Sequence, residues 1–316
     1  MAVYTKVHEN ELEVFLKKHD IGNLISFKGI EQGVENTNYH LLTTQGRYIL
    51  TLFENRVNPA DLPFFFAYQE HLAANGIKCP SAVEDKNGNK TGRLCGRPAA
   101  IITFLEGKGL NPDEITANHC GQLGAAVATM HEAAAKFPLM RPNSVSLKMW
   151  RELATKTSAR AGEILNGLSD FIDLELTHIE ENWPKDLPRA AVHADIFPDN
   201  VFFNDGKFSG IIDFYFTATD FLSYDLALII NAWCFDTNQF VPERFQAFMK
   251  AYEALRPMRD DEREALTLLC RGAAMRILMT RLHDWLFHTP DAFVKPKDPR
   301  EYIEKLKFHQ NGGLNE

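Results

Sequence analysis

The chain contains 316 residues, of which 34 are basic and 42 acidic, so its formal net charge is −8. Apolar types make up 45% and charged types 24%, which is typical of a globular protein. A chain of this length usually exceeds one hydrophobic core, so we expect two lobes. The acidic excess argues against a general nucleic-acid binder, since such proteins need a positive surface.

The sequence carries no evident signal for a membrane or for secretion. No apolar run reaches the roughly 18 residues of a membrane span, and the N-terminal segment lacks the layout of a signal peptide. The five cysteines are odd in number and scattered, which is typical of reduced cytosolic thiols. We therefore expect a cytoplasmic enzyme without nucleic-acid or membrane partners. Nothing calls for a second chain, so we expect a monomer.

The first third of the chain predicts a small sheet with two helices. Apolar residues at helical spacing indicate a helix within 8–20, and two prolines open a second helix at about 59–75. Turn-forming residues, glycines among them, separate the strands. Strands are expected at 24–30, 38–43, 47–53 and 98–105, with two short ones around a turn at 85–89.

Beyond a glycine-containing linker at 106–109, the hydrophobic period becomes that of helices. A β segment at 190–214 interrupts them, with a hairpin whose turn is Asn204–Gly206. The helices are expected at 115–135, 147–168, 171–183, 220–235, 242–255 and 260–288. The prediction is an α+β protein with a mostly-β N-lobe, residues 1–105, and a larger mostly-α C-lobe, residues 106–316.

The β segment inside the C-lobe holds the candidate catalytic residues. Asn200 directly precedes one strand of the hairpin and Asp213 follows the other, so the hairpin should bring both side chains together. Asp195 lies five residues before Asn200. Oxygen ligands of this kind are those that Mg²⁺ prefers. Asp and Asn also form turns, so each could simply cap a loop; the joint spacing favours a metal site with a neighbouring base.

The spacing His193-x-Asp195-x-x-Pro198-x-Asn200, followed by Asp213, resembles the catalytic loop and metal-binding Asp of protein-kinase-like folds. Within that superfamily, HADIFPDN and the later IIDF are similar to the aminoglycoside phosphotransferase and choline kinase branch. One departure is an alanine, at position 194, where that branch usually has glycine. The resemblance implies a bilobal protein-kinase-like fold.

Three longer stretches, at 33–54, 192–200 and 211–234, resemble the bacterial homoserine kinases of this fold. The resemblance covers almost the whole chain. It implies an enzyme that uses ATP and Mg²⁺ to phosphorylate the side-chain hydroxyl of L-homoserine, giving O-phospho-L-homoserine for threonine biosynthesis.

The resemblance also implies roles for single residues. Asp195 would be the catalytic residue that takes or orients the substrate hydroxyl proton, and Asn200 and Asp213 would hold Mg²⁺ at the ATP phosphates. His193 would shape the catalytic loop. Asp225 would steady that loop from the following helix, although a carboxylate in a first helical turn is equally explained by the helix dipole.

Nucleotide contacts are expected from a loop at 29–39, from the third strand and from the linker between the lobes, with Ile101 and Ile102 as further apolar walls. The residues expected at the nucleotide are Gly33, Asn36, Thr37, Asn38, Thr51, Thr103, Phe104, Leu105 and Ile212.

The cation that kinase-like folds carry on the third strand is missing here. Its position is Thr51, and the helix position of its Glu partner falls on Phe65 or Phe66. The absence of both the strand cation and its Glu partner is physically consistent, because a buried charge without its partner is energetically costly. The cation at the phosphates is left open. The side-chain candidates are Arg47, Arg56 and Lys108, and the alternative is that Mg²⁺ neutralises a larger share of the phosphate charge.

A zwitterionic acceptor with a hydroxyl needs an acid, a base and an orienting partner. Arg281 and Asp284 share a helix face, so an ordinary surface ion pair is an equally open explanation for them. The acceptor candidates are Asp195, Tyr215, Asp220, Trp233, Arg276, Arg281 and Asp284.

Other functions remain open. A kinase for choline would want an aromatic cage, for which rings are present at 214–216, 221 and 233; a kinase for an aminoglycoside would want a strongly acidic mouth. A catalytically inactive binding module would explain the missing strand cation. A His/Asp metal hydrolase built on His193 and Asp195 lacks a convincing second His, since His131 looks ordinary and helical.

Overall fold

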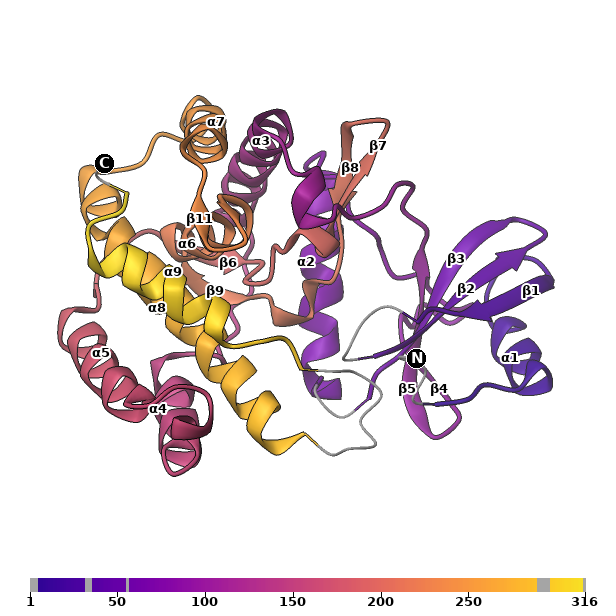
Figure 1. Cartoon of the computed structure of the whole chain (residues 1–316). Helices are drawn as coiled ribbons and strands as arrows, with labels where there is room; N and C mark the ends of the chain where they lie inside the picture. Colours follow the sequence, from indigo (N-terminus) through magenta and orange to yellow (C-terminus); the bar gives the residue numbers. More distant parts are fainter. Residues whose placement is uncertain (1–4, 32–35, 55–56, 289–295, 315–316) are drawn as a thin grey trace. The chain divides into compact units, whose positions relative to one another are not determined.

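The computed structural model describes residues 5–31, 36–54, 57–288 and 296–314. The chain divides into two compact units, which are described separately (Figure 1). Unit 1 comprises Met1–Glu106 and Gly210–Tyr215, and unit 2 comprises Gly107–Ser209 and Phe216–Glu316. Unit 1 thus includes a short returning segment that the division by sequence placed with the helices.

Unit 1 is built on a five-stranded antiparallel sheet with strand order β1-β2-β3-β5-β4. The predicted long strands are confirmed to within two residues. Only one of the two short strands expected around 85–89 forms, because Ala82 makes just an isolated bridge to Ile102. The strands are β1 (Leu24–Gly29), β2 (Thr37–Thr43), β3 (Gly46–Leu52), β4 (Gly92–Leu94) and β5 (Arg97–Thr103).

Two helices complete unit 1. Helix α1 (Glu9–Leu16) buries Leu12 and Phe15 in one core with residues of the sheet. Helix α2 (Leu62–Ala74) follows a 3₁₀ turn whose first backbone N–H groups are partly satisfied by the Asn58 side chain.

The returning segment of unit 1 is held by backbone and ring contacts. Ile211 N–H donates to the carbonyl of Lys78 at 3.0 Å, and the rings of Tyr68 and Phe214 meet edge to face with centroids 6.0 Å apart. These contacts, with helix α2 and the segment after it, explain why 210–215 belongs to unit 1.

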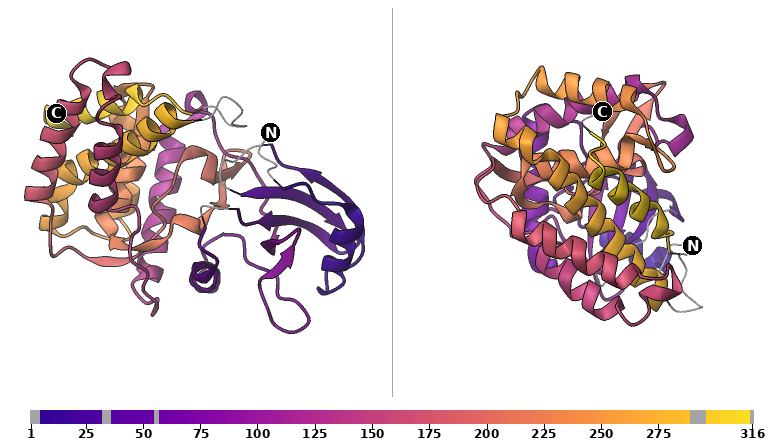
Figure 2. Two further views of the ribbon diagram at one scale, coloured as in Figure 1. Left: turned by 90° about the horizontal axis from the view of Figure 1, so that it is seen from below. Right: turned by 60° about the vertical axis from the view of Figure 1, so that its left-hand side comes forward.

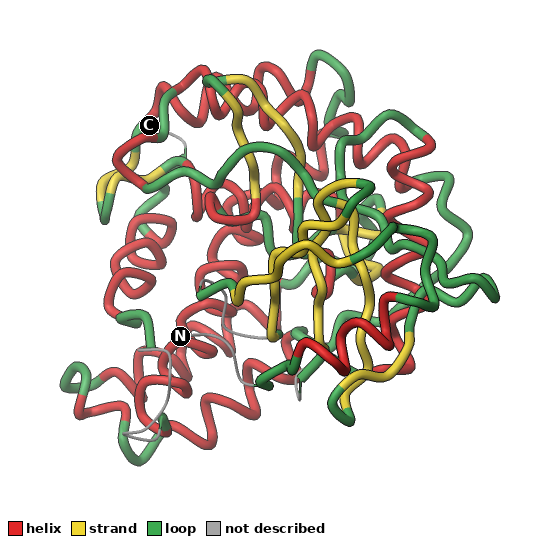
Figure 3. Tube along the Cα trace, turned by 90° about the vertical axis from the view of Figure 1, so that its right-hand side faces the viewer, coloured by secondary structure: helices red, strands yellow, loops and turns green. Residues whose placement is uncertain are grey.

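Unit 2 is mainly helical (Figures 2 and 3). Its long helix α8 packs against α4, α5, α6 and α9, and α3 packs along α7. In the part of the chain that the structure describes, no helix is long and apolar enough to cross a membrane. The helices are α3 (Ala117–Ala134), α4 (Leu147–Thr157), α5 (Leu168–Asn182), α6 (Leu222–Trp233), α7 (Pro242–Glu253), α8 (Asp260–Phe287) and α9 (Arg300–Gln310).

This part of the chain also forms three two-stranded sheets, which are β6–β9, β7–β8 and β10–β11. The predicted hairpin turn is confirmed. Asp205 and Gly206 both have positive φ, 50° and 71°, as a tight two-residue hairpin turn requires. The strands are β6 (Arg189–Val192), β7 (Val201–Asn204), β8 (Lys207–Ile211), β9 (Ala218–Phe221), β10 (Phe235–Asp236) and β11 (Gln239–Phe240).

Two helix predictions in unit 2 were wrong in extent. The helix expected at 147–168 ends at Thr157, and Gly167, in the left-handed region with φ 77°, directly precedes α5. The helix expected from Asp220 begins at Leu222, because residues 218–221 pair with β6 as strand β9.

Candidate active site

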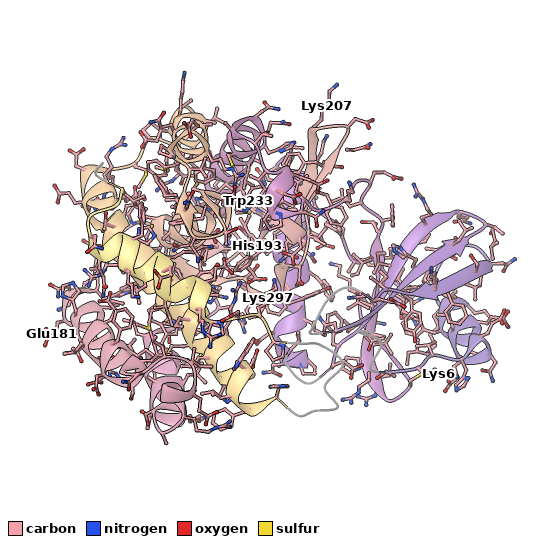
Figure 4. The ribbon with its side chains drawn as sticks, viewed as in Figure 1. Lys6, Glu181, His193, Lys207, Trp233 and Lys297 are labelled. Atoms are coloured by element: carbon pink, nitrogen blue, oxygen red, sulfur yellow. The ribbon has the colours of Figure 1, made fainter. Side chains whose placement is uncertain are left out.

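The segment between β6 and β7 forms the candidate catalytic loop, defined here as residues 193–200. His193 is fully buried, and its ring Nδ1 lies 3.2 Å from the Asp195 backbone N–H, which donates to it. Trp233, also fully buried, donates its indole N–H to the carbonyl of Ile196 at 2.9 Å. Figure 4 labels His193 and Trp233, which come from the loop and from the end of α6. The loop is therefore supported by its own histidine and by a ring beneath it.

Ala194 adopts an unusual backbone conformation, with φ 63°. The left-handed region costs an L-residue about 1–2 kcal/mol, which accounts for the glycine usual at this position in the kinases that the motif resembles. Alanine is held there by a hydrogen bond from its N–H to Asp225 Oδ1 at 2.8 Å. Its side chain is almost completely buried.

Asp225, on the first turn of α6, is the buried acceptor for this loop. Its carboxylate accepts the N–H groups of both His193 (3.1 Å) and Ala194, and His131 Nε2 lies 3.2 Å from Oδ2. Burial raises the pKa of Asp225, but the hydrogen bond and charge of His131, with His193 and the Ala194 N–H, outweigh it and hold this pKa below its ordinary value.

The structure adds His131 to the residues selected from the sequence. Its other nitrogen, Nδ1, lies 2.8 Å from the hydroxyl of Tyr252, which accepts from Arg256 at 2.9 Å. Nothing local in the alanine-rich helix α3 marks His131, since its partner Asp225 lies 94 residues further on.

Asn200 is oriented by the residue proposed as catalytic. Its Nδ2 donates to the backbone carbonyl of Asp195 at 2.9 Å and to the Asp195 carboxylate at 3.1 Å. The amide oxygen Oδ1 is therefore the atom that is left to ligate a cation. An amide oxygen fits Mg²⁺, which prefers hard oxygen donors.

Asp213 comes two residues after β8 and lies in unit 1. Its φ is 64°, a left-handed conformation that Asp tolerates better than most residues. The residues after it, Phe214 to Phe216, form a 3₁₀ turn. Tyr215 in this turn packs its ring edge to face against Phe53 and Phe65, with centroids 5.1 and 5.8 Å away.

Neutral groups occupy the strand position where kinase-like folds carry a cation. Thr51 is buried on β3 and donates its hydroxyl to Asn38 Oδ1 on β2 at 2.8 Å. Burial raises the pKa of the Tyr215 hydroxyl, and the Asp213 charge adds to this, while a hydrogen bond with Thr51 lowers it. Phe65, at the expected helix position of the acidic partner, is buried.

The segment expected at the phosphates lies partly outside the described residues, and Gly33 is among those not described. The described part is anchored through Glu54, which accepts from the Thr37 hydroxyl at 2.8 Å and pairs with Arg97 Nε at 3.1 Å. Asn36 Oδ1 accepts the Glu54 N–H at 3.4 Å. Neither Glu54 nor Arg97 stands in a motif that marks it as a functional residue.

The remaining nucleotide candidates sit at the end of β5 and in the returning segment. Thr103 Oγ1 accepts the Ser81 N–H at 2.9 Å. Ile212 is half-buried. Leu105 lies so close to Gly210 that a β-carbon on that glycine would come within 2.9 Å of its Cδ2.

The cation candidates have other partners. Arg47 pairs with Glu106 and stacks over the Phe104 ring at 4.4 Å. Lys108 Nζ lies 3.7 Å from Glu114. Arg56 falls outside the described residues.

The acceptor candidates of unit 2 are not all gathered in one place. Arg276 lies at the catalytic loop, with Nη2 3.9 Å from Asp195 Oδ1. Asp220 accepts the Asn143 amide at 2.7 Å. Arg281 donates to Glu301 at 2.6 Å, and Asp284 Oδ1 lies 3.6 Å from the ring nitrogen Nδ1 of His283.

Solved structures share this fold. An amicoumacin kinase in complex with AMP-PNP and Ca²⁺ aligns with a TM-score of 0.74 over 96% of this chain and 93% of that one, at 13% identity. The choline kinase of Cryptosporidium parvum aligns with a TM-score of 0.68 over 98% and 96%, at 14% identity. The predicted α+β, protein-kinase-like fold class is confirmed.

Sequence comparison defines the class and then the group within it. The phosphotransferase enzyme family matches residues 26–261. The homoserine kinase of Paramagnetospirillum magneticum is 51% identical over 317 residues, covering 98% of this chain and 97% of that protein. The homoserine kinase of Rhizobium meliloti is 50% identical over 311 residues, covering 98% and 95%. The chain belongs to the phosphotransferase enzyme family, within the group that contains the homoserine kinases.

Proposed function

We propose that this enzyme transfers the γ-phosphoryl group of ATP to the side-chain hydroxyl of L-homoserine, giving O-phospho-L-homoserine for threonine biosynthesis. The observation that carries the proposal is identity of about 50% to curated homoserine kinases over 98% of the chain. The bound AMP-PNP and Ca²⁺ of the amicoumacin kinase support the use of a nucleotide with a divalent cation.

In this proposal Asp195 accepts or orients the proton of the acceptor hydroxyl. Phosphoryl transfer passes through a loose transition state, so positioning and charge neutralisation matter more than strong base catalysis. Asp195 is 19% exposed and its two oxygens face different partners, Asn200 at Oδ2 and Arg276 at Oδ1. A carboxylate held in this way is oriented before the acceptor binds.

Mg²⁺ would be held by the amide oxygen of Asn200 and the carboxylate of Asp213. When bound, the ion neutralises negative charge on the phosphate oxygens. The Asn200 side chain is turned for this role by its two bonds to Asp195. We assign nucleotide covering to the N-lobe, residues 1–105, and catalysis and acceptor binding to residues 106–316.

The aromatic residues give little support to a choline kinase. A quaternary ammonium needs several accessible ring faces, whereas Phe214 and Trp233 are fully buried. Phe216 and Phe221 each lie under a guanidinium, from Arg276 and Arg189. We also propose a monomeric enzyme in the cytoplasm, and the five free cysteines support the cytoplasmic location.

Release of ADP from Mg-ATP, measured with a coupled assay, tests the function. The acceptors are L-homoserine, choline, L-serine and kanamycin, and we expect turnover with L-homoserine far above the others. Turnover with choline or kanamycin but not homoserine would overturn the substrate assignment. No turnover with any acceptor would favour an inactive binding module.

A further inference from the structure

Arg276, on α8, is a buried cation whose contacts lie at the catalytic loop. The residue is only 3% exposed. Its Nη1 donates to the backbone carbonyl of Ala194, and its Nη2 lies 3.9 Å from Asp195 Oδ1. Its guanidinium carbon stands 5.5 Å from the centre of the Phe216 ring. These contacts hold the two terminal nitrogens of the guanidinium at the catalytic loop, while its buried Nε makes no hydrogen bond within the described residues.

Both peptide groups that flank the Cα of Ala194 are therefore held by charged side chains. The Asp225 carboxylate of α6 accepts the Ala194 N–H, and the Arg276 guanidinium of α8 donates to the Ala194 carbonyl. Residues in sparsely populated backbone regions persist only where their surroundings determine them. Two side chains of opposite charge, one from each helix, supply that determination.

A half-buried arginine on the same helix, paired with a buried carboxylate, provides a comparison. Arg271 donates two bonds to the Glu175 carboxylate, at 2.6 and 2.7 Å, and Glu175 is 4% exposed. Removing Arg271 would strand a buried charge, which is strongly destabilising. Removing Arg276 leaves Asp195, which is 19% exposed and keeps the hydrogen bond from Asn200, so the stability loss should be smaller.

We infer that Arg276 is a positioning residue for Asp195, acting through the Ala194 carbonyl, and not the group that binds the acceptor carboxylate. The inference rests on the proposed function, because it takes Asp195 as the catalytic residue. It deepens that function by naming what fixes the loop on the side opposite Asp225.

Steady-state kinetics of three variants test it. Arg276→Met should lower kcat about 100-fold, the effect of a small misplacement at the reacting group, while KM for L-homoserine and for ATP stays close to wild type. Arg276→Lys should regain part of kcat, because an ammonium can still donate to the Ala194 carbonyl. Arg271→Met should lower the thermal midpoint more than Arg276→Met does, yet keep kcat near wild type.

A KM for L-homoserine that rises sharply in Arg276→Met, with kcat preserved, would overturn the inference and place Arg276 on the acceptor. If the wild type prefers another acceptor, the same comparison is made with that acceptor, which separates the two proposals.

Hydrogen–deuterium exchange of the substrate-free protein gives a readout that needs no activity. Peptides covering 190–200 should exchange faster in Arg276→Met, relative to peptides of α3 in the same sample. Arg271→Met should show no such local increase. Unchanged exchange at 190–200 in Arg276→Met would contradict the inference. Should Arg276→Met fail to fold, Arg276→Lys carries both measurements.

Discussion

The catalytic loop of unit 2 and the β3 position of unit 1 are held in place by different kinds of interaction, which are charged in the loop and neutral on the strand. The loop is held by buried charges, Asp225 on its N–H groups and Arg276 on a carbonyl. The strand position is held by a neutral hydrogen bond between Thr51 and Asn38 and by packed aromatic rings. The loop of unit 2 therefore depends on buried charges, whereas the strand position of unit 1 depends on neutral groups.

Substitutions should therefore have unequal effects at these two positions. A buried charge with specific partners is expensive to disturb, because its partner is then left uncompensated. A neutral hydrogen bond contributes only about 1 kcal/mol net. Removing a charge that holds the loop should therefore have a much larger effect than a substitution at the strand position.

The largest effect is expected for Asp195→Asn. Loss of the carboxylate that takes or orients the hydroxyl proton should lower kcat about 1000-fold or more, measured by coupled ADP release. Nucleotide affinity, measured by calorimetry, should persist. Asp199→Asn, an exposed position in the same loop, serves as the control and should stay active. Substantial turnover by Asp195→Asn would refute the assigned role.

Asp225→Asn should destabilise unit 2 by about 3 kcal/mol, as for a broken buried pair, and should also reduce kcat. The amide presents only one acceptor oxygen to two N–H groups and to His131. Urea unfolding measures the loss. Ser223→Ala on the same helix turn is a matched control, since its buried hydroxyl makes no hydrogen bond within the described residues. Equal stability of the two variants would contradict the role of Asp225 in holding the catalytic loop.

Unit 2 also buries a neutral histidine among cations, and this histidine should make the stability depend on pH. Burial, with the charges of Lys305 and Arg271, lowers the pKa of His309 on α9 to about 3, while its Nε2 bonds to Asn231. The unfolded chain takes up this proton below about pH 6.5. The contribution of neutral His309 to the free energy of unfolding is therefore fully present above that pH. It falls as the pH drops from 6.5 toward 3, by up to about 1.4 kcal/mol per pH unit.

His309→Gln can keep the bond to Asn231 without titrating. Urea unfolding at several pH values between 7.5 and 5 should give a shallower pH dependence for this variant than for the wild type. Identical slopes would show that His309 does not take part in the pH response.

The smallest effect is expected for Thr51→Ala. It removes one neutral hydrogen bond, so stability should fall by about 1 kcal/mol, and substantial activity should remain in the ADP-release assay. Thr51→Val separates the hydroxyl from the volume of the side chain. A loss of kcat comparable to that of Asp195→Ala would show that this strand position still serves the phosphates.

Local signals carried the parts of the fold that the sequence predicted. The hairpin turn at Asp205–Gly206 follows from residues that tolerate positive φ, and β1 to β3 follow from alternation and glycine turns. Strand β9 was missed because its pairing with β6 is remote in sequence. Nothing in residues 218–221 alone distinguishes a strand from the first turn of a helix.

The candidate site was likewise predictable only where the signal is local in the sequence. Motif spacing selected Asp195, Asn200 and Asp213, but it could not place Arg276, whose carbonyl partner lies 82 residues earlier in the chain. His131 was judged ordinary because its setting in α3 is ordinary. Its connection to Asp225 exists only after α3 and α6 come together.

Product analysis by phosphorus NMR tests whether the enzyme phosphorylates L-homoserine and whether Asp195 is needed for the transfer. Wild-type enzyme with Mg-ATP and L-homoserine should give ADP and one new phosphomonoester on the side-chain oxygen, in equal amounts, and Asp195→Asn should give neither. ADP without a phosphorylated acceptor, or a phosphomonoester only when choline or kanamycin replaces homoserine, would contradict the account.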